Sequence, residues 1–447
     1  MFTPGVGGVN LRVNPQVSVL VSSPSAGGTV AAVRSLGAAG YNVGVLYNSQ
    51  LSAAVWSRYA ARAYRTPPET DTGPFLARLL EIGAQRPGQV LLASSDETAW
   101  LYADNASTLS GQFVVYQPPI ETIRRILDKS ELAAAAKNVA IATPSIWEPF
   151  DGRDLADLSS TLPYPVLIKP RTHVQRINND KGVIIHSREE LMRELDAFVA
   201  RESRLARESS RLANPKPPLL QRFVQSGSGA VSITGFIDRA GELFATRRCA
   251  KVLQRLTATG VGLCFEALPP DKDLSDAVRR LCRELGYFGI FEVEFLWMEG
   301  RWALIDFNPR LFNQVGLDIS REMPLPLLAC LDAIGETRAL QEAVERAQAY
   351  DQTQPAVIYD GFTLRATLLA QALTRSPAAA EREKWKLWMK KHSSHAVGFA
   401  TDRRDWAPAV VHALSEAYLG LLALPRFLQV GSEKAASGTA ITTNKVS

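Results

Sequence analysis

The chain contains little cysteine and no long apolar segment. Its 447 residues include four cysteines, and no two of them form a CxxC pair. This spacing excludes a zinc ribbon and a disulfide framework. No stretch of about 18 uninterrupted apolar residues is present, so no segment is predicted to span a membrane. The first residues also lack the apolar core of a signal peptide, and we expect a cytoplasmic protein.

The chain also lacks a concentrated charge of one sign. Lysine and arginine together number 50 against 45 aspartate and glutamate residues, and the formal net charge is +5. Because these charges are spread along the chain without a basic tract, no nucleic-acid partner is predicted. An apolar content of 46% is typical of a soluble globular protein, and the length allows two or three domains.

The N-terminal third alternates apolar strands with a helix, which indicates a doubly wound α/β domain. The expected elements are strands at 17–21, 41–47, 90–93 and 113–116 and a helix at 29–39. The loop before this helix, SPSAGGT, is not a GxGxxG motif, so a dinucleotide site is not expected. Ser94–Thr98, SSDET, follows a strand at its carboxyl end. Asp96 and Glu97 either face a ligand cleft there or serve only as helix-capping residues.

The most informative segment is FEVEFLWMEGRWALIDFNPRLFN, which begins at Phe291. It predicts two strands joined by a short turn at Met298–Gly300, with Glu294 on one and Asp306 on the other. Side chains alternate along a strand, so Asp306 and Asn308 share a face, and Glu294 joins them if the hairpin pairs. Such oxygen ligands suit Mg²⁺ bound to phosphates. The alternative is a hairpin with ordinary carboxylates and a tight turn.

Two further segments favour a nucleotide site. In YPVLIKP, Lys169 ends a short apolar run, where a lysine either extends along the surface or directs its charge into a cleft. In PLLQRFV, which ends at Val224, an apolar strand runs into the small, flexible QSGSGA linker. An adenine could bind against such a strand and its backbone.

These motifs, in this order, resemble the ATP-grasp superfamily, in particular the carboxylate–amine ligases related to biotin carboxylase and carbamoyl-phosphate synthetase. That family has a strand lysine in V-x-K-P, a linker between two lobes and a final V-[DE]-F…[DE]-x-N-P-R hairpin. Here the matching residues are Leu167–Pro170, Leu220–Val224, and Val293–Phe295 with Asp306–Arg310. The resemblance covers roughly residues 15–330.

The resemblance implies an α/β fold in several parts. We expect an N-terminal Rossmann-like pre-ATP-grasp domain at 1–125 and a two-lobed ATP-grasp domain at 126–335, with lobes at about 126–218 and 219–335. A C-terminal helical region at 336–430 and a disordered tail at 431–447 would follow.

The resemblance also implies ATP and Mg²⁺ as cofactors and assigns roles to single residues. ATP would be contacted by Lys129, Lys169, Lys181, Gln221, Phe223 and Val224, and Mg²⁺ by Glu294, Asp306 and Asn308. Arg310, Lys169 and Arg248 would act on the transferring phosphate. Arg248 follows a predicted hairpin together with Arg247 and Lys251, and these basic residues either stabilise the phosphate, bind an anionic substrate or are solvated surface charges. The implied reaction converts a carboxylate into an acyl phosphate, which an amine or another nucleophile then attacks.

Three departures from the family pattern keep a second function open. The loop after Lys169-Pro170 has basic residues and a single glycine, Gly182. Arg222 stands where the family favours glutamate, and the ribose-binding carboxylate expected near Gly229 is missing. The chain is therefore either an ATP-dependent ligase or a degenerate ATP-grasp protein that binds nucleotide as a regulatory or scaffolding module.

The last third of the chain has its own signature. Trp385, Trp388 and Met389 share one helical face flanked by lysines, and the segment at 407–428 is apolar over most of its circumference. Both helices either pack on the core or form a peripheral membrane or protein-docking surface at 380–430. The sequence does not decide whether the protein forms a homodimer.

Overall fold

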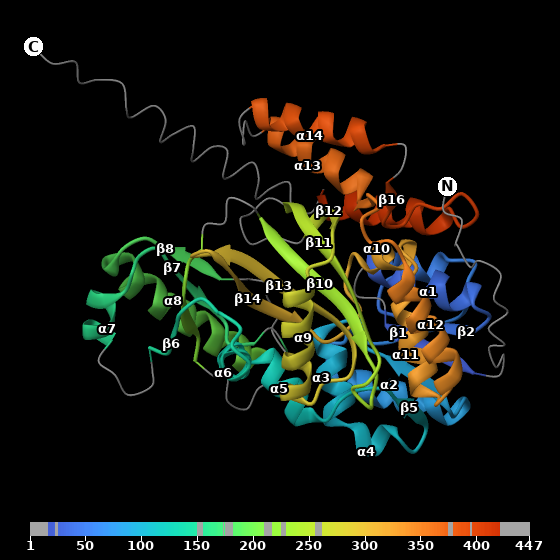
Figure 1. The fold of residues 1–447 in the computed structure, drawn as a ribbon. Coiled ribbons are helices and arrows are strands. Elements are labelled where there is room, and N and C mark those ends of the chain that lie inside the picture. Colours follow the sequence, from blue (N-terminus) through green and yellow to red (C-terminus); the bar gives the residue numbers. More distant parts are fainter. Residues whose placement is uncertain are drawn as a thin grey trace, which may run out of the picture.

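The structure, a computed structural model, describes residues 17–22, 26–149, 155–172, 174, 182–209, 217–224, 229–254, 262–373, 379–393 and 396–420. Within these residues the strands form three sheets, and helices cover their faces (Figure 1). No helix in this part of the chain is long and apolar enough to cross a membrane.

The first sheet is parallel and five-stranded, which confirms the α/β fold expected for the N-terminal third. Its order is β3 (Ala60–Arg65), β2 (Asn42–Tyr47), β1 (Ser18–Ser22), β4 (Gln89–Leu92) and β5 (Phe113–Val115). The strand β3 was not predicted, because it is an edge strand whose AARAYR sequence is mostly exposed and has no apolar run. The helices that follow these strands are α1 (Ala26–Ala38), η1 (Ala53–Trp56), α2 (Thr72–Gln85), α3 (Asp96–Asp104) and α4 (Ala106–Leu109).

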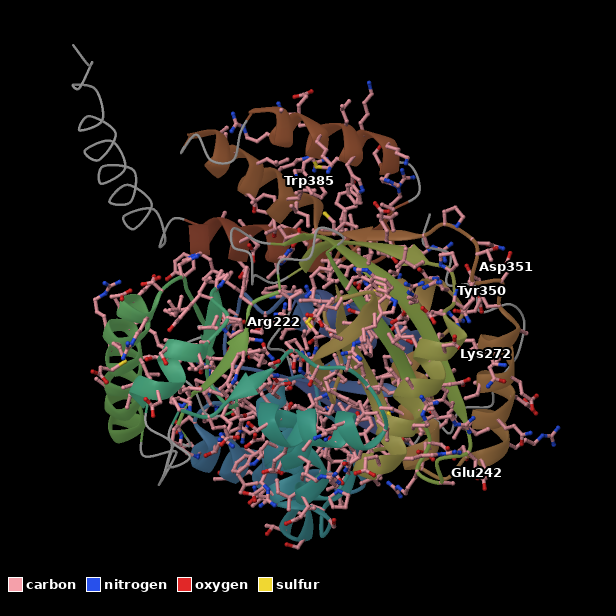
Figure 2. All side chains as sticks on the ribbon, turned by 60° about the vertical axis from the view of Figure 1, so that its left-hand side comes forward. Arg222, Glu242, Lys272, Tyr350, Asp351 and Trp385 are labelled. Atoms are coloured by element: carbon pink, nitrogen blue, oxygen red, sulfur yellow. The ribbon has the colours of Figure 1, made fainter. Side chains whose placement is uncertain are left out.

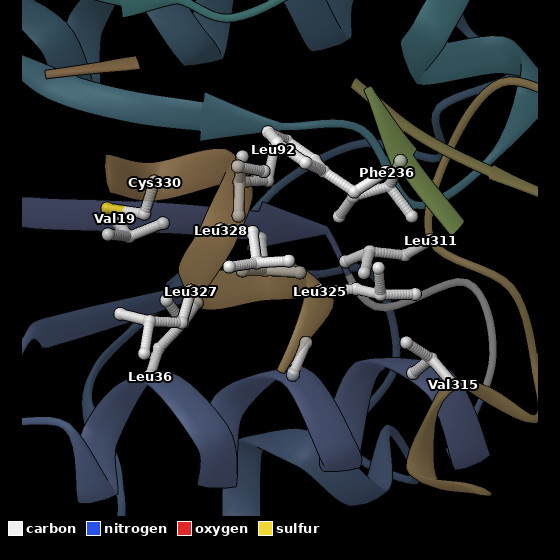
Figure 3. Packing of buried hydrophobic residues seen from close by; sticks show 14 of the residues in the cluster. Val19, Leu36, Leu92, Phe236, Leu311, Val315, Leu325, Leu327, Leu328 and Cys330 are labelled. Carbon is white, nitrogen blue, oxygen red and sulfur yellow. The ribbon is translucent and has the colours of Figure 1, made fainter. Parts of the chain in front are cut away.

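Alternating residues of this sheet enter two separate cores. Val19 and Leu92 face α1 and α11 (Leu325–Ala333), whereas Leu20 and Leu91 pack with residues of α2 and α3. Figure 3 shows Leu327, Leu328 and Cys330 of α11 packed among side chains of the N-terminal sheet. The expected domain at 1–125 therefore shares its core with a helix about 200 residues later in the chain.

The second sheet forms a small lobe of its own. It is antiparallel, in the order β6 (Ile146–Trp147), β9 (Leu219–Arg222), β7 (Val166–Lys169) and β8 (Val183–Ile185). One face is covered by α7 (Leu155–Thr161) and α8 (Arg188–Ser209), which pack on Val166, Ile168 and Leu220. The helices α5 (Ile120–Leu127) and α6 (Lys129–Asn138) connect the N-terminal domain to this lobe (Figure 1).

The third sheet is the largest and carries the diagnostic hairpin. Its order is β14 (Arg301–Asn308), β13 (Gly289–Met298), β10 (Ala230–Ile237), β11 (Phe244–Gln254), β12 (Gly262–Leu268), β15 (Val357–Tyr359) and β16 (Val397–Gly398). One face packs on α6 and α9 (Lys272–Leu285) through Ile233, Val293 and Phe307. The opposite face meets α10 (Val315–Ser320) through Leu317.

The C-terminal region was expected to be helical, but it also contains two strands. β15 and β16 extend the third sheet between the helices of this region. The helices are α12 (Thr337–Ala349), α13 (Gly361–Leu373) and α14 (Ala379–His392), and a further helix covers 407–420. Trp385, labelled in Figure 2, is 7% exposed and packs with Cys264 and Leu364. This contact agrees with the expectation that α14 packs on the core.

A buried carboxylate holds the end of this region on the N-terminal domain. Asp405 is 3% exposed and accepts hydrogen bonds from Arg34 Nε at 2.8 Å, Ser57 Oγ at 2.7 Å and the Arg58 amide at 2.8 Å. Trp406, Leu414 and Tyr418 nevertheless remain more than half exposed. The docking surface stays a prediction, and residues 421–447, with the expected tail, lie outside the described residues.

Candidate active site

The hairpin places the three expected metal ligands on one face of the third sheet. In the antiparallel register of β13 and β14, Glu294 is opposite Asp306 and Glu292 is opposite Asn308. A register shift follows Glu294 in this pairing. The intervening residues Val293 and Phe307 point to the other face, where they are buried against α9. Strand alternation therefore separates a row of oxygen ligands from the hydrophobic core.

Lys129 contacts this face from the N-terminus of α6. Asp128 caps the helix by accepting a hydrogen bond from the Ser130 amide at 3.0 Å, and the Lys129 amide donates to the Arg171 carbonyl at 3.0 Å. These bonds fix the start of the helix. The Lys129 ammonium group then forms an ion pair with Asp306, and the lysine is only 7% exposed.

A second lysine, Lys251 of β11, reaches the same face. Its Nζ lies 2.8 Å from Glu294 Oε1, and both side chains are largely buried. Burial alone would lower the pKa of Lys251, but Glu294 and Glu292 outweigh it and raise the pKa above the usual value. Lys251 therefore stays charged over the physiological pH range.

Arg248, by contrast, is not brought to the site. Its cross-strand partner on β10 is Ile233, a residue of the α9 core, so its side chain lies on the opposite face from Glu294. There its guanidinium stacks on Trp302 at 5.4 Å and lies 3.9 Å from Asp271. Arg248 and Lys251 both lie on β11, and the register of this strand with β10 shows that Lys251, not Arg248, is on the face of Glu294.

Arg310 connects the hairpin to the N-terminal domain. Its Nε donates to Asp96 Oδ1 at 2.8 Å and its Nη2 to Asn308 Oδ1 at 3.0 Å. Burial would lower the pKa of Arg310, but Asp96 raises it above the usual value. Asp96 is the first residue of α3, and Ser95 caps that helix. The SSDET segment thus does both things that its sequence allowed: it caps a helix and supplies a carboxylate to the site.

The expected nucleotide contacts lie on the small lobe. Lys169 and Gln221 occupy the face of the second sheet that points away from α7 and α8, because their neighbours Ile168 and Leu220 fill the helix-covered core. Phe223 and Val224 follow β9 and are half-buried, and the Phe223 amide donates to the Pro165 carbonyl at 3.3 Å. Lys181 lies outside the described residues.

One more carboxylate on this face, Glu292, was not predicted from the sequence. It stands two residues before Glu294 and is only 4% exposed. Burial and the neighbouring Glu294 raise its pKa above the usual value. The alternation FEVEF carried the signal, because both glutamates fall on one face of β13.

The oxygen donors fit Mg²⁺ better than a transition metal. Glu294, Asp306 and Asn308 offer two carboxylates and one amide oxygen, the hard donors that Mg²⁺ takes together with phosphate oxygens. Within the described residues, no group of three or more His, Cys, Asp or Glu side chains could hold a metal by itself. A site that is completed by substrate phosphates needs no such group.

Comparison with solved structures gives matches along most of the chain. The biotin carboxylase domain of Hydrogenobacter thermophilus 2-oxoglutarate carboxylase, solved as a dimer with MgADP, ADP and bicarbonate, matches with a TM-score of 0.57 at 17% identity. The match covers 71% of this chain and 69% of that one. The chain therefore has the same fold as that domain, the ATP-grasp fold.

Two other solved structures match equally widely. An L-amino acid ligase from Bacillus licheniformis has a TM-score of 0.53 at 16% identity, covering 71% of this chain and 74% of that one. N5-carboxyaminoimidazole ribonucleotide synthetase from Thermus thermophilus has a TM-score of 0.53 at 17% identity, covering 71% and 78%. No family model and no curated protein matches the sequence. The resemblance seen in the sequence is thus confirmed for the fold.

Proposed function

We propose that this protein is an ATP- and Mg²⁺-dependent ligase. It converts a substrate carboxylate into an acyl phosphate, joins the acyl group to an amine or another nucleophile, and releases ADP and phosphate. The observation that carries this proposal is the shared face of Glu294, Asp306 and Asn308, which Lys129 and Lys251 contact from two other elements. Bound Mg²⁺ and ATP would supply the phosphoryl group and neutralise its developing charge.

The chain's own residues then act by binding and by charge. Glu294, Asp306 and Asn308 hold the metal, and Lys169 together with Gln221, Phe223 and Val224 holds the nucleotide on the small lobe. In the structure, Lys129 and Lys251 neutralise Asp306 and Glu294. We expect each lysine to exchange its carboxylate for phosphate or substrate oxygens once a metal occupies the carboxylates.

Arg310 is the remaining cation of the proposed machinery. Asp96 and Asn308 orient its guanidinium from two sides, so it is positioned before any substrate binds. A pre-oriented cation stabilises charge in the transition state without a reorganisation cost. Lys251 takes the third catalytic position that the sequence analysis assigned to Arg248, because it lies on the correct face.

A second candidate, a nucleotide-binding module without turnover, rests on one observation. Both proposed metal carboxylates already have a lysine partner, so the site is charge-compensated without metal. A single experiment distinguishes the two functions. A ligase releases ADP from Mg-ATP in the presence of its substrates, whereas a binding module shows Mg²⁺-dependent nucleotide binding with no release.

The test is a screen for ADP release against a panel of amino acids, hydroxy acids and amines. Bicarbonate belongs in the panel because it is bound in one of the structural neighbours. Asp306→Asn is the inactive control, since it removes one of two metal carboxylates without adding bulk. Turnover that Asp306→Asn abolishes supports the ligase. ADP release at the wild-type rate by Asp306→Asn would refute the metal assignment.

A further inference from the structure

Glu292 is a buried carboxylate in contact with the proposed metal site, and the proposed chemistry does not use it. Three side chains donate hydrogen bonds to it. Ser232 Oγ donates to Oε1 at 2.9 Å, Gln314 Nε2 donates to the same oxygen, and Asn308 Nδ2 donates to Oε2 at 3.0 Å. Both carboxylate oxygens therefore already have hydrogen-bond donors.

The position of Glu292 calls for an explanation because a buried carboxylate is costly. A charged group removed from water is tolerated only when hydrogen bonds or opposite charges compensate it. An apolar residue would fill a position that is 4% exposed at lower cost. Here three donors from three different elements, β10, β14 and the turn before α10, converge on one side chain. Such a network of hydrogen bonds fixes the positions of the side chains that take part in it.

What it specifies is the orientation of one amide. The Asn308 side chain lies between Glu292, which only accepts hydrogen bonds, and Arg310, which only donates them. Only one orientation satisfies both neighbours, with Nδ2 toward Glu292 and Oδ1 toward Arg310. A carbonyl oxygen has two lone pairs, and among the described residues Arg310 is the donor that occupies one of them.

We propose that Glu292 is a positioning residue that fixes the Asn308 amide with its oxygen, not its nitrogen, toward the metal site. The inference rests on the proposed function, because it assigns Asn308 as a metal ligand. The proposal gives Glu292 no direct contact with the metal: its oxygens accept from Ser232, Gln314 and Asn308. Gln314 and Ser232 hold Glu292 in turn. The sequence signal is the spacing of Glu292 and Gln314 around the DFNPR motif.

The test exchanges the acid and the amide. Asn308→Asp alone brings two acceptor-only carboxylates into contact, and Glu292→Gln alone turns an amide NH₂ group toward the Asn308 NH₂ group. The double variant restores every bond. The new amide at position 292 then donates to the new carboxylate at position 308 and accepts from Ser232 and Gln314. The other oxygen of that carboxylate still faces Arg310, and the total charge equals that of the wild type.

The readout is binding of Mn²⁺ to the ADP-loaded protein, measured as free Mn²⁺ by electron paramagnetic resonance. We expect each single variant to weaken Mn²⁺ binding about fivefold or more, the range for a mismatched buried hydrogen bond. The double variant should recover to within about threefold of the wild type. Glu342→Gln, an exposed carboxylate on α12, is the matched control and should bind as the wild type does.

The outcomes separate the inference from the proposed function. A wild-type protein without ADP-dependent Mn²⁺ binding would refute the proposed function and, with it, this role of Glu292. A wild type that binds Mn²⁺ and a double variant no better than the weaker single variant would refute the inference alone. A purely structural role predicts lower urea midpoints in the single variants with unchanged Mn²⁺ affinity, and that result also overturns it.

Discussion

Replacing Lys251 by methionine should lower kcat by about 10²–10³ while leaving metal binding intact. Met fills a similar volume without the charge, so the substitution isolates the electrostatic role of the lysine. In the structure, Lys251 and Lys129 are the lysines paired with carboxylates on a face that carries Glu292, Glu294 and Asp306. Removing Lys251 leaves three carboxylates and one lysine on this face, and the greater negative charge favours binding of a divalent cation.

The magnitudes follow from burial. The Lys251 and Glu294 side chains are 9% and 15% exposed. Removing one partner of a buried ion pair lowers the free energy of unfolding by about 3–5 kcal/mol. For Lys251→Met we expect a loss of about 3 kcal/mol, because Glu294 keeps some contact with water. Loss of a pre-oriented cation at a transferring phosphate should lower kcat by about 10²–10³.

The assay combines ADP release with urea denaturation. Lys251→Met should lose turnover with the substrate pair that the panel identifies, and its half-saturating Mg²⁺ concentration should not rise. Adding Glu294→Gln should restore the urea midpoint but not turnover. Lys272→Met, at the exposed start of α9, is the matched control (Figure 2). A Lys251→Met enzyme within threefold of the wild-type kcat/KM would show that Lys251 has no catalytic role.

Three further predictions test the assignments around the site. Arg248→Met should keep kcat/KM within about threefold of the wild type, because the guanidinium stacks on Trp302 on the opposite face of the sheet; a hundredfold loss measured by ADP release would return Arg248 to the site. Burial raises the pKa of Asp318 to about 7, so the folded state binds its proton more tightly than the unfolded state and Asp318 destabilises the fold as pH rises from about 4 to 7. Asp318→Asn should therefore flatten the fall in urea midpoint over that range, and an unchanged pH profile would contradict the assignment. Asp405→Asn should free the C-terminal segment from the N-terminal domain at a cost of about 3 kcal/mol, seen as faster hydrogen exchange at residues 396–420 against unchanged exchange in β13.

Much of the site was predictable because it depends on local strand geometry. The positions of Glu294, Asp306 and Asn308 on one face follow from alternation along two strands joined by a short turn. The start of α6 at Lys129 follows from the capping residue Asp128. The parallel N-terminal sheet follows from its alternating strands and helix.

The rest depends on contacts between distant parts of the chain. Arg248 and Lys251 stand on the same strand, and only the register of β11 against β10 decides that Lys251 faces the site. The Asp96–Arg310 ion pair joins residues 214 positions apart. The strands β15 and β16 are three and two residues long; β15 pairs with β12, a strand formed earlier in the chain, and β16 pairs with β15. No local pattern carries this information.

An oxygen-transfer experiment can show whether the substrate carboxylate becomes an acyl phosphate at the expense of ATP. The substrate carboxylate is labelled with ¹⁸O and turned over with Mg-ATP and the nucleophile. Attack of the carboxylate on the γ-phosphate predicts ADP as product and one ¹⁸O atom in each inorganic phosphate. The same label in AMP, with pyrophosphate released, or ADP with unlabelled phosphate would rule out an acyl phosphate formed from the substrate carboxylate.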